Sequence, residues 1–166
     1  MTDRAIFNRK YTSFTPGSTQ VWLVNGAGVS TSAAATQDFT AGVDLIQGEV
    51  VYVSGVYALP ASAASGVAPA QYQAIGITAS AASGSSTVSV NLDDIAVVSD
   101  ANITAEAALV PGQYYYLSQY DGQMTRFETI SGAVSAANGY AAVVNLGLAL
   151  SPTELHVEIQ SPITLS

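Results

Sequence analysis

The chain has 166 residues, of which 49% are hydrophobic and only 10% are charged. This balance excludes disorder over most of the chain and allows one large domain or two small ones. There is no cysteine, which excludes disulfide bonds, thiolate zinc sites and a cysteine nucleophile. The net charge of −8 comes from twelve carboxylates against four Lys and Arg side chains, so we expect no binding to nucleic acid.

The first 20 residues are polar, contain Pro16 and Gly17, and show no sustained hydrophobic period. Three of the four cations lie there together with three aromatic residues, and the set is Arg4, Phe7, Arg9, Lys10, Tyr11 and Phe14. We predict an extended arm that docks on a neighbouring protein, because buried aromatic side chains contribute large contact areas. A loose terminus is the alternative. We expect neither a secretory signal nor a membrane-spanning helix, since no long apolar run occurs.

Residues 21–100 contain short β-prone segments between turn formers. We predict strands at 21–24, 50–53, 74–78 and 87–90, the last continuing to 95–98. The glycine loop that follows residue 24 lacks the third glycine of a dinucleotide-binding motif, because Thr31 occupies that position. A hairpin turn at Asn25-Gly26 is the better interpretation.

The second half repeats the plan of the first. Residues 103–118 match residues 39–54 at an offset of 64 without a gap, and both contain a Leu-x-x-Gly motif, at 45–48 and 109–112. Further along, residues 146–151 resemble 75–80, and residues 157–159 resemble 88–90. We interpret this as a duplication.

Helical periodicity is weak throughout, and many short strands favour a barrel or a sandwich. We therefore predict an all-β body built from two similar β units, with an extended N-terminal arm. The predicted divisions are an arm at 1–20, a first unit at 21–100 and a second unit at 101–166 packed with the first. One barrel and two lobes both remain open.

An aromatic concentration lies at 114–127. Asp121-Gly122 between two β-prone runs predicts a tight hairpin over 113–128. On its first strand, Tyr114 and Tyr116 share a face that Tyr115 does not. We predict that Tyr114, Tyr116 and Tyr120 pack at a core edge or subunit interface, and a carbohydrate site is the alternative.

Few residues suggest catalytic or metal chemistry. His156 is the only histidine and shares a strand face with Glu154 and Glu158, which predicts a solvated face rather than a metal site. Asp93-Asp94 are interpreted as turn residues, with a weak calcium site as the alternative. No serine lies in a nucleophile-elbow motif. We predict that the chain is not an enzyme and uses no cofactor or metal.

Several motifs together resemble a known class of proteins. They are Leu-x-x-Gly-x-x-Tyr-Tyr-Leu-Ser at 109–118, Asp-Gly-Gln-Met-Thr at 121–125 and the run 146–159, preceded by 45–54 and Ala-Ile-Gly-Ile-Thr at 74–78. Over residues 39–159 the chain resembles virion proteins of tailed bacteriophages, in particular small capsid decoration (cement) proteins. The module also occurs in tail and fibre proteins.

The resemblance implies a non-enzymatic protein located on the outer capsid surface of the virion and made in the host cytoplasm. It implies the major capsid protein as partner and a homo-oligomer, with a trimer favoured. The alternative is a tail-fibre or host receptor-binding β module. The basic arm and the lack of coiled-coil heptads favour decoration over a fibre.

Overall fold

The computed structural model describes residues 35–126 and 139–165. The predicted arm, the strand predicted at 21–24 and the turn predicted at Asn25-Gly26 lie outside the described residues. From Thr36 onward the chain forms one compact unit. The all-β prediction is confirmed, since the described helices are two short 3-10 turns, η1 (Pro69–Tyr72) and η2 (Asp100–Asn102).

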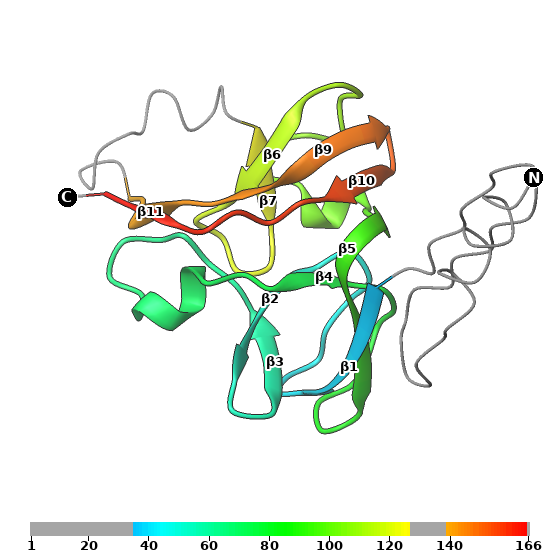
Figure 1. The fold of residues 1–166 in the computed structure, drawn as a ribbon, viewed down its shortest axis with the longest axis vertical. Helices are drawn as coiled ribbons and strands as arrows, with labels where there is room; N and C mark the ends of the chain where they lie inside the picture. The colour runs from blue at the N-terminus through cyan, green and yellow to red at the C-terminus, as the bar shows by residue number, and fades with distance from the viewer. Residues whose placement is uncertain (1–34, 127–138, 166) are drawn as a thin grey trace, which may run out of the picture. The chain divides into compact units, whose positions relative to one another are not determined.

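Nine strands form one continuous sheet in the order β1-β3-β2-β4-β5-β10-β9-β6-β7 (Figure 1). Their bounds are β1 (Ala35–Ala41), β2 (Val50–Ser54), β3 (Tyr57–Pro60), β4 (Gly76–Thr78), β5 (Thr87–Val97), β6 (Tyr114–Leu117), β7 (Met124–Arg126), β9 (Asn145–Ser151) and β10 (Glu154–Val157). A separate two-stranded sheet joins β8 (Ala142–Val143) to β11 (Ile163–Thr164).

The first half closes on itself. β1 pairs with β3 in parallel and also with β5, so β1-β3-β2-β4-β5 form a ring. A small ring of this kind is filled by side chains. Its filling is a cluster of six buried apolar residues: Ala41, Leu45, Val51, Ala58, Val88 and Val90. A larger cluster draws on both halves, including Ile77 of β4 and Leu155 of β10, so the halves share a core.

Strand pairing repeats between the halves in the same register. The matching pairs are Val50↔Ile77 and Val51↔Gly76 between β2 and β4, and Tyr114↔Leu148 and Tyr115↔Gly147 between β6 and β9. The first partners differ by 64 residues and the second by 71, which are the offsets seen in the sequence. The sequence repeat is therefore also a repeat of strand pairing.

The Leu-x-x-Gly motif has the same backbone geometry in both halves. Gly48 and Gly112 have φ of +84° and +81°, a conformation that favours glycine. The Gly48 N–H donates to the carbonyl of Thr78 in β4 at 2.9 Å, and the Gly112 N–H donates to the carbonyl of Ala149 in β9 at 2.8 Å. The motif thus turns the chain into β2 or β6 and ties the turn to the neighbouring strand.

Thr78 reinforces this turn in the first half. Its buried hydroxyl accepts a hydrogen bond from the Glu49 N–H at 2.9 Å and donates one to the Ile46 carbonyl at 2.5 Å. Ala149 occupies the equivalent place in the second half and has no hydroxyl. The side-chain bonds are therefore particular to the first unit.

The apolar-Gly-apolar motif marks a close approach between strands. A Cβ on Gly76 would overlap the carbonyl oxygen of Asn91 in β5, and a Cβ on Gly147 would overlap that of His156 in β10. The pairs Ile77↔Asn91 and Leu148↔His156 place these carbonyls in equivalent positions. The predicted match of residues 88–90 with 157–159 is therefore wrong, because the registers align Asn91 with His156.

The interpretation of Asp93-Asp94 as turn residues is also wrong, since both lie inside β5. β5 pairs with β4 through residues up to Asn91 and with β10 from Asp94 onward. Asp94 has φ +94°, an uncommon value that bends the strand at this change of partner. β5 is therefore the strand that joins the two halves.

The predicted hairpin at 113–128 is confirmed as far as it is described. β6 and β7 pair antiparallel from Tyr115↔Arg126 to Leu117↔Met124. The connection spans residues 118–123 and is longer than the tight turn predicted. It closes with a Gln123 N–H to Tyr120 carbonyl bond of 3.2 Å, and Gly122 has φ +69°.

Candidate functional site

The predicted docking arm lies outside the described residues. Its six side chains, Arg4, Phe7, Arg9, Lys10, Tyr11 and Phe14, therefore remain a prediction from the sequence. The described residues contain three other candidate sites: the tyrosines of the β6–β7 hairpin, the solvent side of the sheet, and a groove.

The three tyrosines on β6 alternate between solvent and core. Tyr114 is 48% exposed, Tyr115 is fully buried, and Tyr116 is half-buried against the larger core cluster. This is the alternation predicted for a strand. Tyr120, which is 54% exposed, lies in the hairpin turn. Tyr114 thus faces solvent, Tyr116 packs against the core after a register shift between Tyr115 and Tyr116, and Tyr120 lies beyond the end of the strand.

Tyr115 is held by a polar network at the edge of the core. Its hydroxyl accepts a hydrogen bond from the Val110 N–H and donates one to Oε2 of Glu106, both at 2.9 Å. Arg126 of β7 forms an ion pair with the same carboxylate. Burial raises the pKa of Tyr115 above its ordinary value. These contacts fix the loop before β6 against the hairpin, which is a structural role.

Burial also raises the pKa of the Glu49 carboxyl, and nearby Asp121 adds to this effect. A hydrogen bond from the Ile46 N–H to Oε2 at 3.0 Å acts in the opposite direction. Burial likewise raises the pKa of Tyr140. Glu49 and Tyr140 each form a hydrogen bond with a backbone group of a turn. Neither has the arrangement of a general base beside a nucleophile.

A row of solvent-facing side chains crosses four adjacent strands of the second half. The registers place Ile95 of β5 beside His156 of β10, His156 beside Leu148 of β9, and Leu148 beside Tyr114 of β6. Ile95 is 45% exposed, and Leu148 is half-buried. Figure 1 shows β9 and β10 side by side.

Two further apolar side chains extend this row. Val97, next to Glu154 in the register, is 49% exposed, and Leu150, in the irregular step between β9 and β10, is 46% exposed. We call the whole surface the outer face. It consists of Ile95, Val97, Tyr114, Leu148, Leu150 and His156.

The opposite side of the same strands is the core. Ala96, Ala149, Leu155 and Val157 are all buried. The solvent side of β5 and β9 is therefore rich in apolar side chains as well, although β10 between them exposes Glu154 and His156, whereas an antiparallel sheet that faces water usually has polar residues on that side. Surfaces of this kind are typical of sites that another molecule covers.

Sequence reasoning missed the outer face as a site. It predicted correctly that Glu154, His156 and Glu158 are exposed while Leu155 and Val157 are buried. The missed signal is the lack of alternation in the two neighbouring strands, in the apolar runs 95–98 and 146–150. A run that is apolar at both parities indicates a strand covered on both sides.

Carboxylates dominate the charge of the described body. Of the twelve in the chain, only Asp3 and Glu128 lie outside the described residues, so ten are described against one cation, Arg126. Arg126 is already paired with Glu106. Glu154 and Glu158 lie exposed on β10 and just after it, which places carboxylates beside the outer face.

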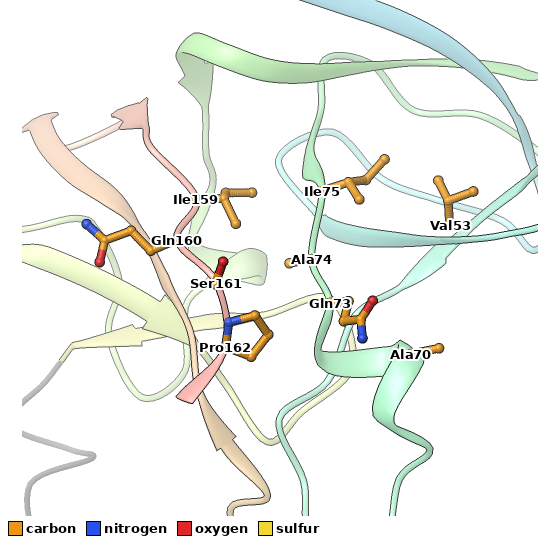
Figure 2. Close-up of a pocket in the computed structure, with 9 residues that line it drawn as sticks. All are labelled: Val53, Ala70, Gln73, Ala74, Ile75, Ile159, Gln160, Ser161 and Pro162. Atoms are coloured by element: carbon orange, nitrogen blue, oxygen red, sulfur yellow. The ribbon is translucent and has the colours of Figure 1, made fainter. Parts of the chain in front are cut away.

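A groove of ≈ 500 Å³ lies where the two halves of the sheet separate (Figure 2). One side is formed by residues 73–75 with Val53 and Ala70, and the other by residues 159–162. None of the described residues that line it is ionisable, and their side-chain polar groups are the amides of Gln73 and Gln160 and the hydroxyl of Ser161. These groups can form hydrogen bonds but provide no acid or base at neutral pH.

Within residues 35–126 and 139–165, no three His, Asp or Glu side chains lie together in a way that could hold a metal ion. No helix of this part of the chain is long and apolar enough to cross a membrane. His156 has the apolar residues Ile95 and Leu148 as its cross-strand neighbours.

No protein-family model matches the chain, and no curated protein is similar to it in sequence.

Proposed function

We propose that the chain is a non-enzymatic structural protein of a tailed-phage virion that binds the outer capsid surface and stabilises the shell. Its partner is the major capsid protein, and its working form is a homo-oligomer, with a trimer favoured. The observation that carries the proposal is the outer face, a sheet surface with several exposed apolar side chains. The resemblance of residues 39–159 to decoration proteins supports a capsid as the binding partner of this surface.

The architecture suits such a role. A decoration protein contributes stability by binding across neighbouring subunits of the assembled shell and not to the dissociated subunits, so that binding favours assembly. Its own fold must therefore be rigid. The ring of the first half, the shared core and the continuous sheet supply this rigidity. The arm at 1–20 would extend the contact area at the cost of ordering entropy.

Co-sedimentation tests the proposal. Shells of the virus that encodes the chain, purified without it, are mixed with increasing amounts of the protein and pelleted. We expect saturation at a fixed ratio to shell subunits and a rise in the temperature at which the shells disassemble. Failure of the protein to pellet with the shells would refute the proposal.

The alternative is a tail-fibre or host receptor-binding module. The exposed rings of Tyr114 and Tyr120 favour it, since aromatic rings stack on sugars. Binding to host cells or their surface glycans, lost in Tyr114→Ala and Tyr120→Ala, would support this alternative if the shells bind nothing.

A further inference from the structure

The outer face presents apolar side chains in a strongly acidic body. Ile95 and Val97 of β5 and Leu150 of β9 are between 45% and 49% exposed, and β10 lies between these two strands. Covering such side chains with an apolar partner is favourable because their surface leaves water. These side chains of the outer face therefore fit apolar groups of a partner.

Carboxylates lie between and beside these apolar side chains, without described cations next to them. Glu154 is next to Val97 in the register, and Glu158 follows β10. The only described cation, Arg126, lies on β7 and pairs with Glu106. A partner that covers the face must therefore offer positive charges to these carboxylates, or their lost hydration is not compensated.

A second copy of the described body does not meet this condition. It would bring the same carboxylates against one another, from a body with ten carboxylates and one paired arginine. Like charges across an interface oppose association. The charge pattern of the described residues therefore favours a different protein over a second copy of the described body on this face.

We infer that the outer face docks on a surface of another protein that has apolar side chains interspersed with Lys or Arg side chains. The inference rests on the proposed function, in which that surface belongs to the shell. It assigns the shell contact to β5, β10, β9 and β6, and it requires the contact to weaken with salt.

A matched pair of double variants tests the contribution of the apolar side chains of the outer face. Val97→Thr with Leu150→Ser removes apolar contacts from the outer face, while Val56→Thr with Ile163→Ser makes the same kind of change elsewhere. Val56 and Ile163 are 65% and 68% exposed. In the shell co-sedimentation assay we expect the first variant to bind about tenfold more weakly than wild type. The second should stay within about twofold of it.

A matched pair of charge reversals tests the contribution of the carboxylates of the outer face. Glu154→Lys and Asp121→Lys change the net charge equally, but Asp121 lies in the exposed β6–β7 turn. We expect Glu154→Lys to weaken binding and to reduce its dependence on salt between about 0.05 M and about 0.5 M. Asp121→Lys should retain the affinity of wild type. Circular dichroism spectra that match wild type show that each variant is folded.

The outcomes separate the inference from the proposed function. Wild-type binding that the outer-face variants leave unchanged overturns the inference and leaves the proposed function intact. A wild-type protein that does not bind shells overturns both. Sedimentation velocity of the protein alone tests whether a second copy binds the outer face. Self-association of wild type that is lost in the variant Val97→Thr with Leu150→Ser would assign the face to a second copy and overturn the inference.

Discussion

The approach of β9 to β10 at Gly147 provides the sharpest test of the fold. Gly147 has φ +147°, and an added Cβ would overlap the carbonyl oxygen of His156. That carbonyl has little room to move, because β10 is paired with β5 on one side and β9 on the other. Overpacking costs about 1–3 kcal/mol, and the backbone conformation adds about 1–2 kcal/mol for a residue with a Cβ.

We therefore expect Gly147→Ala to lower the free energy of unfolding by about 2–5 kcal/mol. This corresponds to a fall in Tm of about 4–20 °C for a chain of this size. Urea unfolding followed by far-UV circular dichroism measures the first quantity, and a thermal melt measures the second. A Gly147→Ala protein within about 0.5 kcal/mol of wild type would refute the reasoning.

Two comparison variants separate the two causes. Gly76→Ala meets the carbonyl of Asn91 without a positive φ, so it tests lack of space alone and should cost about 1–3 kcal/mol. Gly55 has φ +64° and nothing within 4 Å of an added Cβ. Gly55→Ala thus tests the backbone alone and should cost about 1–2 kcal/mol.

Three further predictions concern buried polar groups. Tyr115→Phe removes a hydroxyl from two hydrogen bonds and should lower the free energy of unfolding in urea by about 1–2 kcal/mol; an unchanged midpoint would contradict this. Thr78→Val removes a buried hydroxyl that both donates and accepts, so it should cost about 1–3 kcal/mol, and a stabilised variant would show that these bonds contribute nothing. Because burial raises the pKa of Glu49 above 4.5, its contribution to stability is full below the unfolded pKa and is lost as the pH rises through the folded pKa. The free energy of unfolding of Glu49→Gln relative to that of wild type should therefore increase as the pH rises from about 4 to about 7. A difference that stays constant over this range would contradict the raised pKa of Glu49.

The repeat could be predicted from sequence because its determinants are local. Gly48 and Gly112 need positive φ, and Gly76 and Gly147 lie too close to a neighbouring strand for any side chain. Such positions accept almost only glycine, so they remain visible when the surrounding residues differ. The alternation of Tyr114 and Tyr115 followed from strand geometry for the same local reason.

The change of partner along β5 could not be predicted from sequence. Pairing between distant strands depends on register, and a residue such as Asp94 with φ +94° gives no clear sequence signal. The match between 88–90 and 157–159 failed for this reason, since apolar alternation alone fits several registers. Closure of the first half through β1–β5 pairing is equally a long-range property.

The candidate site was only partly predictable. The sequence identified the exposed side chains of β10 and the exposed Tyr114, but the outer face exists only because β5, β10, β9 and β6 are neighbours. Its residues come from four separate segments of the chain. Runs in which successive residues are all apolar indicated strands covered on both sides. Only the strand order shows that the solvent-facing sides of these strands lie next to one another.

Electron cryomicroscopy of shells incubated with the protein tests the central claim most directly. We expect density for the chain at symmetry-related positions on the outer capsid surface, with β5, β10, β9 and β6 facing the shell. Shells that remain bare at saturating protein would contradict the proposed function.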